Sequence, residues 1–103
     1  MSSITASDGR IIVQPEVNVV ASTAESFRQE LLRLITQNSA EIVVDLSKVE
    51  RIDSVGLGVF IASYNTLKKK ERQLKVINAS PKIRSLFQTM GLTRLFAVRG
   101  KVA

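Results

Sequence analysis

The chain has 103 residues, which is enough for one domain with a hydrophobic core and too few for two. Its formal net charge is +6. Cysteine and histidine are absent, which excludes disulfides, thiol chemistry, the usual general base and most transition-metal sites. No apolar stretch approaches the ~20 residues that cross a bilayer, and no secretion signal is visible. We therefore expect a cytoplasmic protein without membrane association.

The N-terminal segment is predicted to form a β-hairpin. Asp8-Gly9 separates ITAS from RIIV, and this dipeptide is typical of the tight turn between two antiparallel strands. Strands are therefore expected near residues 3–7 and 10–14. Pro15 cannot donate a backbone hydrogen bond, so it should end the second strand.

A helix and a buried strand are expected next. Ser22 and Glu25 have the spacing of a capping box, and apolar residues follow at helical intervals at Ala24, Phe27, Leu31, Leu34 and Ile35. This helix should end near residues 37–38. Residues 41–46 contain the continuous apolar run Ile42-Val43-Val44, which predicts a strand covered on both faces.

The C-terminal half is predicted to alternate helices and strands. A second helix is expected over residues 54–70 and a strand over 73–78. Ser80-Pro81 then provides an N-cap followed by proline at the first helical position. The third helix should end at Gly91 and bury one stripe, Ile83, Leu86, Phe87 and Met90. A short edge strand or closing segment should follow, with Leu92, Leu95, Phe96 and Val98, before a frayed tail over 99–103.

This order of elements predicts an α/β fold. Strands that alternate with helices favour a largely parallel sheet, and the opening hairpin adds one antiparallel pair. We expect a mixed sheet of four to five strands with three to four helices. The whole chain should form a single domain, with its core at about residues 3–98.

The excess positive charge raises the question of nucleic-acid binding. Much of it lies in Lys68, Lys69, Lys70 and Arg72, at the expected end of the second helix. Cations there complement the negative helix terminus, so they need no partner. We predict no nucleic-acid binding and keep a small basic nucleic-acid binder as a competing hypothesis.

The second helix carries apolar residues on two sides. Its core face is predicted to contain Leu57, Phe60, Ile61, Tyr64 and Leu67, whereas Val55, Val59 and Ala62 project to the opposite side. Either a neighbouring helix of the same domain or a partner protein could cover the second stripe. Gly56 and Gly58 each cost up to about 1 kcal/mol relative to alanine, which suggests a close approach to the backbone. The glycines alone are also compatible with tight internal packing.

Asp53-Ser54 opens this helix. Asp is a good N-cap, so an ordinary cap is one interpretation. The other is a switch, because a phosphate on Ser54 would add about −1.5 to −2 charges at a helix end that tolerates anions. The adjacent carboxylate would repel that phosphate, and a docked partner would lose close contact.

No catalytic constellation is found. Gly56-x-Gly58 lacks the third glycine of a dinucleotide loop and the lysine of a P-loop, and Ser54 is not in a nucleophile elbow. Asp45 and Asp53 are better explained as a strand end and a helix cap. We therefore predict a protein that is not an enzyme, with no cofactor and no metal.

Several of these segments resemble the signature of STAS domains, and more narrowly of bacterial anti-sigma factor antagonists. The matching segments are VDLSKV at 44–49, IDSVGLG at 52–58, LKVI at 74–77 and SPKIRSLFQTMGL at 80–92. The resemblance covers roughly residues 40–98 well and the N-terminal hairpin loosely. It implies a STAS-like fold.

The resemblance also implies partner switching in signal transduction and transcription regulation. In that family the unphosphorylated domain binds an anti-sigma factor that is also a serine kinase, and this frees a sigma factor. The kinase phosphorylates the serine that follows the aspartate, here Ser54, and the complex dissociates. A PP2C-type serine phosphatase restores the active form, and ATP and metal ions belong to those partners.

The resemblance and the outward apolar stripe of the second helix together predict partner-binding residues around Ser54. They are Asn18, Asp53, Val55, Gly56, Gly58, Val59 and Ala62. Asn18 takes the place of the usual family aspartate, so it keeps hydrogen bonding and loses the charge. We expect a monomer or weak homodimer. The alternative is a STAS interaction module in another regulatory or transport-linked assembly, such as a stressosome-like complex.

Overall fold

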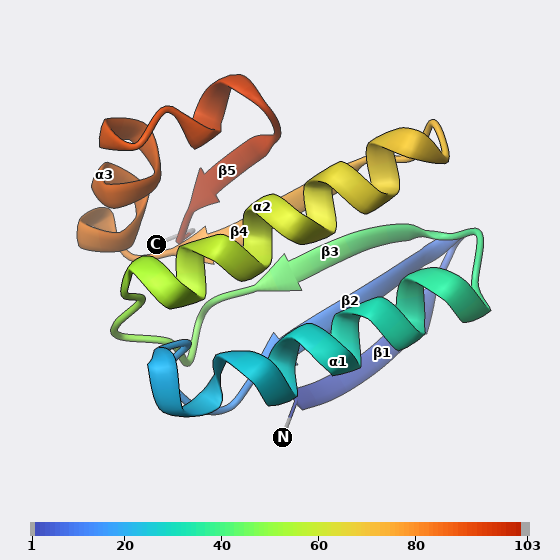
Figure 1. Ribbon diagram of the computed structural model, residues 1–103, viewed down its shortest axis with the longest axis horizontal. Coiled ribbons are helices and arrows are strands. Elements are labelled where there is room, and N and C mark those ends of the chain that lie inside the picture. Colours follow the sequence, from blue (N-terminus) through green and yellow to red (C-terminus); the bar gives the residue numbers. More distant parts are fainter. Residues whose placement is uncertain (1, 102–103) are drawn as a thin grey trace.

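The computed structural model describes residues 2–101 and contains one five-stranded sheet. Its strands lie in the order β1-β2-β3-β4-β5. β1 pairs antiparallel with β2, and all other pairs are parallel (Figure 1). This confirms the mixed sheet with an N-terminal hairpin. The strands are β1 (Ser2–Ser7), β2 (Arg10–Pro15), β3 (Glu41–Asp45), β4 (Leu74–Ala79) and β5 (Ala97–Gly100).

The turn between β1 and β2 is the one the sequence predicts. Asp8 has a φ of 49° and Gly9 a φ of 77°, so both central residues are left-handed, as a primed turn requires. Pro15 is the last residue of β2. The hairpin prediction is therefore confirmed.

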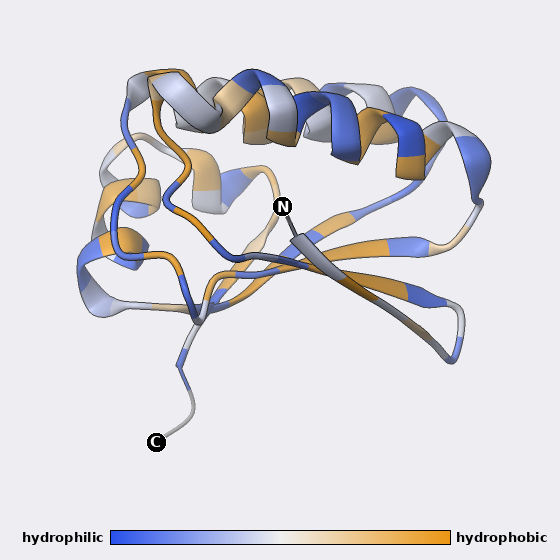
Figure 2. Cartoon of the chain, turned by 90° about the horizontal axis from the view of Figure 1, so that it is seen from below, coloured by the Kyte–Doolittle hydropathy of each residue, from blue (hydrophilic) through white to orange (hydrophobic). Residues whose placement is uncertain are grey.

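Two long helices cover one face of the sheet. They are α1 (Ala21–Gln37) and α2 (Ser54–Lys69), and α3 (Pro81–Thr89) and a 3-10 turn, η1 (Leu92–Arg94), lie beyond them near β5 (Figure 1). Seen from below, α1 and α2 lie together above the sheet (Figure 2). In residues 2–101, none of the helices is both long enough and apolar enough to span a membrane.

Aromatic rings join the three helices in the core. The ring centroids of Phe27 and Phe60 are 6.0 Å apart, and those of Phe60 and Phe87 are 5.2 Å apart. Phe60 and Phe87 are fully buried. Since these rings come from α1, α2 and α3, they fix the first half of α2 between its two neighbours.

The start of α1 differs from the prediction. The helix begins at Ala21, and the Thr23 hydroxyl accepts a hydrogen bond from the Val20 backbone N–H at 3.0 Å. The predicted capping box of Ser22 and Glu25 is therefore wrong. Pairing of the preceding residues with the loop before α2 fixes where the chain turns, and this tertiary contact overrides the local spacing.

The C-terminal end contains two corrections. Met90 is 57% exposed, so its predicted place in the buried stripe of α3 is wrong. Met90 is the C-cap of α3, and Leu92 and Phe96 occupy the core instead. Arg99 is part of β5, so the predicted fraying begins too early, and residues 102–103 lie outside the described residues.

The other face of the sheet carries no helix in the described chain. Val43 on this face is nevertheless only 3% exposed. The Glu41 carboxylate lies 3.1 Å from the Arg10 guanidinium and 3.7 Å from the Lys75 ammonium, so charges of three strands meet there. The expected burial of β3 is correct, but helices cover only one of its faces.

Candidate functional site

One carboxylate connects the first turns of α1 and α2. Asp53 is the N-cap of α2, as predicted, and its Oδ1 accepts a hydrogen bond from the Gly56 N–H at 2.9 Å. Its Oδ2 accepts a second from the Ala21 N–H, at the start of α1, at 2.8 Å. The cap was visible in the sequence. The bridge to α1 was not, because 32 residues separate its ends.

The loops that precede these helices are also tied together. The Asn18 Oδ1 accepts hydrogen bonds from the backbone N–H groups of Glu50 at 2.8 Å and Arg51 at 3.0 Å. The Val19 N–H donates to the Arg51 carbonyl at 3.1 Å. Asn18 therefore hydrogen-bonds to backbone groups of the same chain, and its amide oxygen holds the loop that presents Ser54.

Four of the predicted site residues share the outer surface of α2. Ser54, Gly58 and Ala62 are exposed at four-residue intervals, and Val55 beside them is 50% exposed. Residues four apart lie one above the other on a helix. The serine hydroxyl therefore opens an exposed strip of small and apolar groups.

The other two helix residues of the predicted site face the protein interior. Gly56 is buried, and Val59 is only 4% exposed, so the predicted outward projection of Val59 is wrong. α2 packs against α1 as well as against the sheet, which widens its buried side. The neighbouring helix therefore covers part of the second stripe. Ile61, predicted for the core, is 39% exposed instead.

Gly56 marks a close approach within the chain. A Cβ atom built there would lie 2.0 Å from the Val19 carbonyl oxygen, closer than any real contact. A Cβ atom at Gly58 would meet nothing within 4 Å. Internal packing thus explains the first glycine, whereas the second leaves open space next to Ser54.

The carboxylate at the start of α2 is held ionised. The Gly56 N–H lowers the pKa of Asp53 most, followed by the Ala21 N–H, and the positive charge of Arg51 contributes further. Asp45, the other candidate carboxylate, also has a lowered pKa. Burial alone would raise it, but hydrogen bonds outweigh that effect, led by the one from the Ser47 N–H. Both aspartates have structural partners, as predicted.

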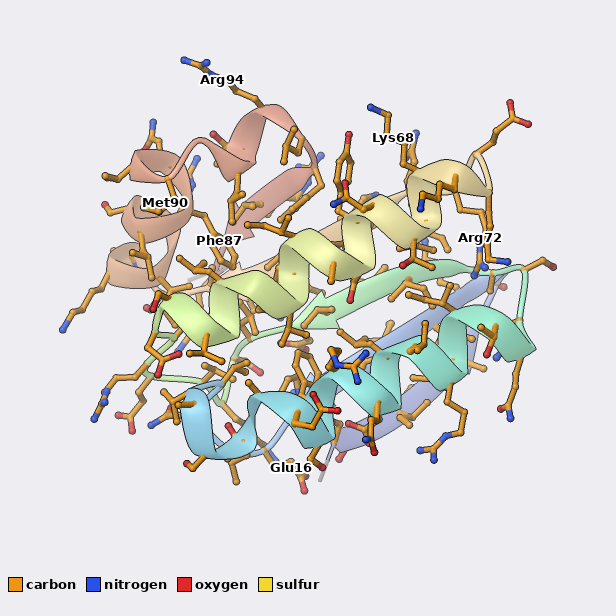
Figure 3. All side chains as sticks on the ribbon, viewed as in Figure 1. Glu16, Lys68, Arg72, Phe87, Met90 and Arg94 are labelled. Atoms are coloured by element: carbon orange, nitrogen blue, oxygen red, sulfur yellow. The ribbon has the colours of Figure 1, made fainter. Side chains whose placement is uncertain are left out.

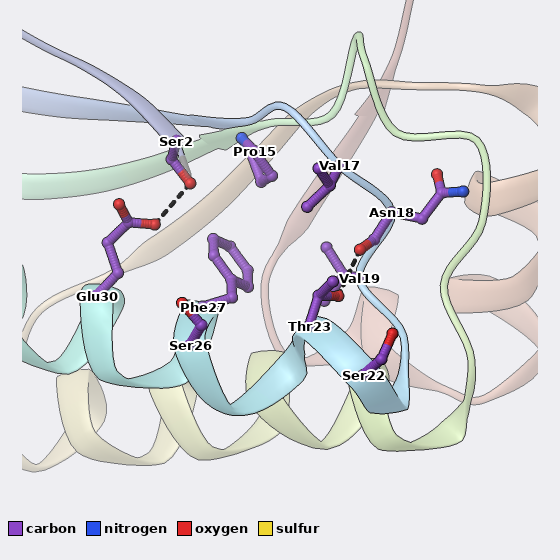
Figure 4. A pocket seen from close by; sticks show the side chains of 10 residues that line it. All are labelled: Ser2, Pro15, Val17, Asn18, Val19, Ser22, Thr23, Ser26, Phe27 and Glu30. Carbon is purple, nitrogen blue, oxygen red and sulfur yellow. Dashed lines mark hydrogen bonds between the residues drawn. The ribbon is translucent and has the colours of Figure 1, made fainter.

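A small apolar pocket lies beside Asn18 (Figure 4). It has a volume of about 90 Å³, and Pro15, Val19 and Phe27 form part of its wall. Ligand sites for small molecules are usually ~300 Å³ or larger. Within residues 2–101, no cluster of three or more acidic, His or Cys side chains is arranged to hold a metal.

The chain is similar to known proteins in sequence and in fold. A model of the STAS domain family matches residues 2–103. The anti-sigma-B factor antagonist of Bacillus subtilis (strain 168) is 31% identical over 94 residues, which are 91% of this chain and 84% of that protein.

Solved structures share the fold. The crystal structure of an anti-sigma factor antagonist from Mycobacterium paratuberculosis has a TM-score of 0.84 at 27% identity, covering 95% of this chain and 84% of that one. The phosphorylated form of the Bacillus cell fate determinant SpoIIAA has a TM-score of 0.74 at 18% identity, covering 97% of this chain and 91% of that one. The latter likeness concerns the fold alone.

Substitution of the two glycines should have opposite effects on stability. Gly56→Ala forces a methyl group against the Val19 carbonyl and should lower the free energy of unfolding by about 1–3 kcal/mol. Gly58→Ala meets no atom and should raise it by about 0.5–1 kcal/mol, because alanine favours the helix. Urea denaturation of both variants measures the difference, and equal effects would contradict the packing at Gly56.

The Asp53 carboxylate should make stability depend on pH. Because folding lowers the pKa of Asp53, its contribution is complete above the unfolded pKa of about 3.9 and is lost as pH falls through the folded value. Asp53→Asn should therefore lower the urea concentration at the unfolding midpoint at pH 7. The difference in this midpoint between wild type and variant should become smaller as the pH is lowered. If the difference in midpoint stayed constant down to pH 2.5, it would argue against an ionised Asp53 carboxylate as the bridge between α1 and α2.

Proposed function

Because the chain belongs to the STAS domain family, we propose that it is an anti-sigma factor antagonist switched by reversible phosphorylation of Ser54. The observation that carries the proposal is the placement of this serine. Ser54 is exposed, is the first residue of α2, and borders the exposed Val55 and Gly58. A hydroxyl in this position is accessible to a second protein that acts on it.

The surroundings of Ser54 would accept a phosphate without unfolding. The first turn of α2 contains no acidic residue after the Asp53 cap, and helix N-termini stabilise anions. Asp53 is engaged with backbone groups of both helices, so the fold does not need the serine hydroxyl. The added charge would therefore act mainly on whatever lies against the outer surface of α2.

The proposed cycle needs two partners. The unphosphorylated chain binds an anti-sigma factor that is also a serine kinase, and the sigma factor is released in the cytoplasm. Phosphorylation of Ser54 places about −1.5 to −2 charges within that interface, where desolvation and repulsion oppose binding. A PP2C-type phosphatase removes the phosphate. This chain acts as a binding protein, and the kinase and phosphatase carry the catalytic groups.

Substitution of the serine should separate binding from phosphorylation. Ser54→Ala should stay folded, bind the kinase constitutively and accept no phosphate, whereas Ser54→Glu should bind about tenfold or more weakly because it keeps a charge in the interface. The measurements are ³²P transfer from ATP and calorimetric titration with the purified anti-sigma factor kinase of the same genome.

Ser22→Ala is the matched control, because Ser22 is also exposed in the first turn of a helix. It should be phosphorylated and bind as wild type does. Phosphate on a serine other than Ser54, or full binding by Ser54→Glu, would overturn the switch. A stable homo-oligomer that binds no kinase would favour a STAS module of another assembly.

A further inference from the structure

An unexplained apolar stripe lies on the outer side of α3. Met90 is 57% exposed and Leu86, one turn before it, is only half-buried. Lys82 lies a further turn back, so the three residues follow one another at four-residue intervals on one face. Figure 3 shows Phe87 between α3 and α2, and the exposed fraction of Met90 places it on the outer side of α3. The core of this protein accounts for part of Leu86, which packs against it, but not for Met90.

The stripe borders an open groove next to the switch residue. We call the α3 groove the space of about 440 Å³ between α3 and the loop before α2, and Ile52, Ile83 and Leu86 form its apolar part. Ile52 lies two residues before Ser54 in the chain, and α3 lies beside the start of α2 (Figure 1). A protein that contacts Ser54 can therefore reach this groove without a long extension.

The rim of the α3 groove carries two cations that are free to pair. Arg51 and Lys82 line it, and neither makes an ion pair within the described part of the chain. Lys48, on the same loop, is instead 3.6 Å from the Glu16 carboxylate. Glu50 is the one acidic residue of the described lining. Cations around an apolar floor complement carboxylates that flank an apolar side chain.

We propose that the α3 groove is a second docking surface for the anti-sigma factor kinase, and that it takes a segment with an apolar side chain flanked by carboxylates. This inference rests on the proposed function and extends it from Ser54 to α3. The apolar side chain contacts Ile52 and Leu86 in the groove, and the segment continues over Met90, which lies outside the lining one turn after Leu86. The carboxylates pair with Arg51 and Lys82.

This surface gives phosphorylation a second mode of action. Arg51 lies in the loop that leads into α2, three residues before Ser54. A phosphate on Ser54 therefore competes for Arg51 with a carboxylate of the partner. The same phosphate repels an acidic segment directly, so one modification weakens both parts of the interface.

Charge reversal in the groove provides the test. Arg51→Glu/Lys82→Glu should weaken binding of the purified anti-sigma factor kinase about tenfold or more, and the salt dependence of the remaining affinity should decrease. Arg84→Glu/Arg94→Glu is the matched control, because both are exposed cations outside the groove and the change in net charge is identical. The control should change the dissociation constant less than threefold.

Met90→Gln tests the apolar contact separately. Since Met90 is largely exposed, the variant should unfold at the wild-type urea concentration and yet bind the kinase several-fold more weakly. Unchanged binding by the groove charge reversal or by Met90→Gln would overturn the α3 groove. Equal losses in the groove reversal and its control would also overturn it, because they would indicate net charge alone.

Ser54→Glu, measured in the same titrations, separates this inference from the proposed function. Loss of binding by Ser54→Glu with full binding by the groove reversal overturns the groove and leaves the switch standing. Loss by the groove reversal with full binding by Ser54→Glu supports the groove and overturns the switch. Failure of the wild-type chain to bind the kinase overturns both.

Discussion

The site depends on one carboxylate that caps two helices at once. Asp53 accepts hydrogen bonds from the first turn of α2 and from the first residue of α1, and so holds the two N-termini at a fixed separation. Gly56 makes this separation possible, because its bare backbone lies against the Val19 carbonyl. A longer side chain there would push the loops apart and would move Ser54 with them.

This arrangement separates structural and exposed residues within a single helical turn. Asp53 and Gly56 face the neighbouring loop and hold it, whereas Ser54 and Val55 face solvent. A change at Ser54 therefore alters the surface without removing a contact that the fold needs. Small domains have only a few kcal/mol of net stability, so a modification that spares their internal bonds is tolerated more easily.

The contact surface proposed for this protein is open to solvent. The pocket beside Asn18 is small and apolar, and the described residues form no metal cluster. The exposed groups around the start of α2 and along α3 instead combine apolar contacts with Arg51 and Lys82. The lysine run at residues 68–70 lies at the other end of α2, where it complements the helix terminus and is remote from Ser54.

The sequence by itself determined the order of elements, the hairpin turn, the cap at Asp53 and the start of α2 at Ser54, because turn and cap chemistry act over a few residues. Only the tertiary structure decided which flank of α2 is buried. Val59 and Gly56 face inward because α1 and the Val19 loop pack there, and Met90 faces outward because α3 ends beyond the core. Helical periodicity identifies apolar stripes, but the neighbours that cover them come from distant parts of the chain, so burial follows from packing.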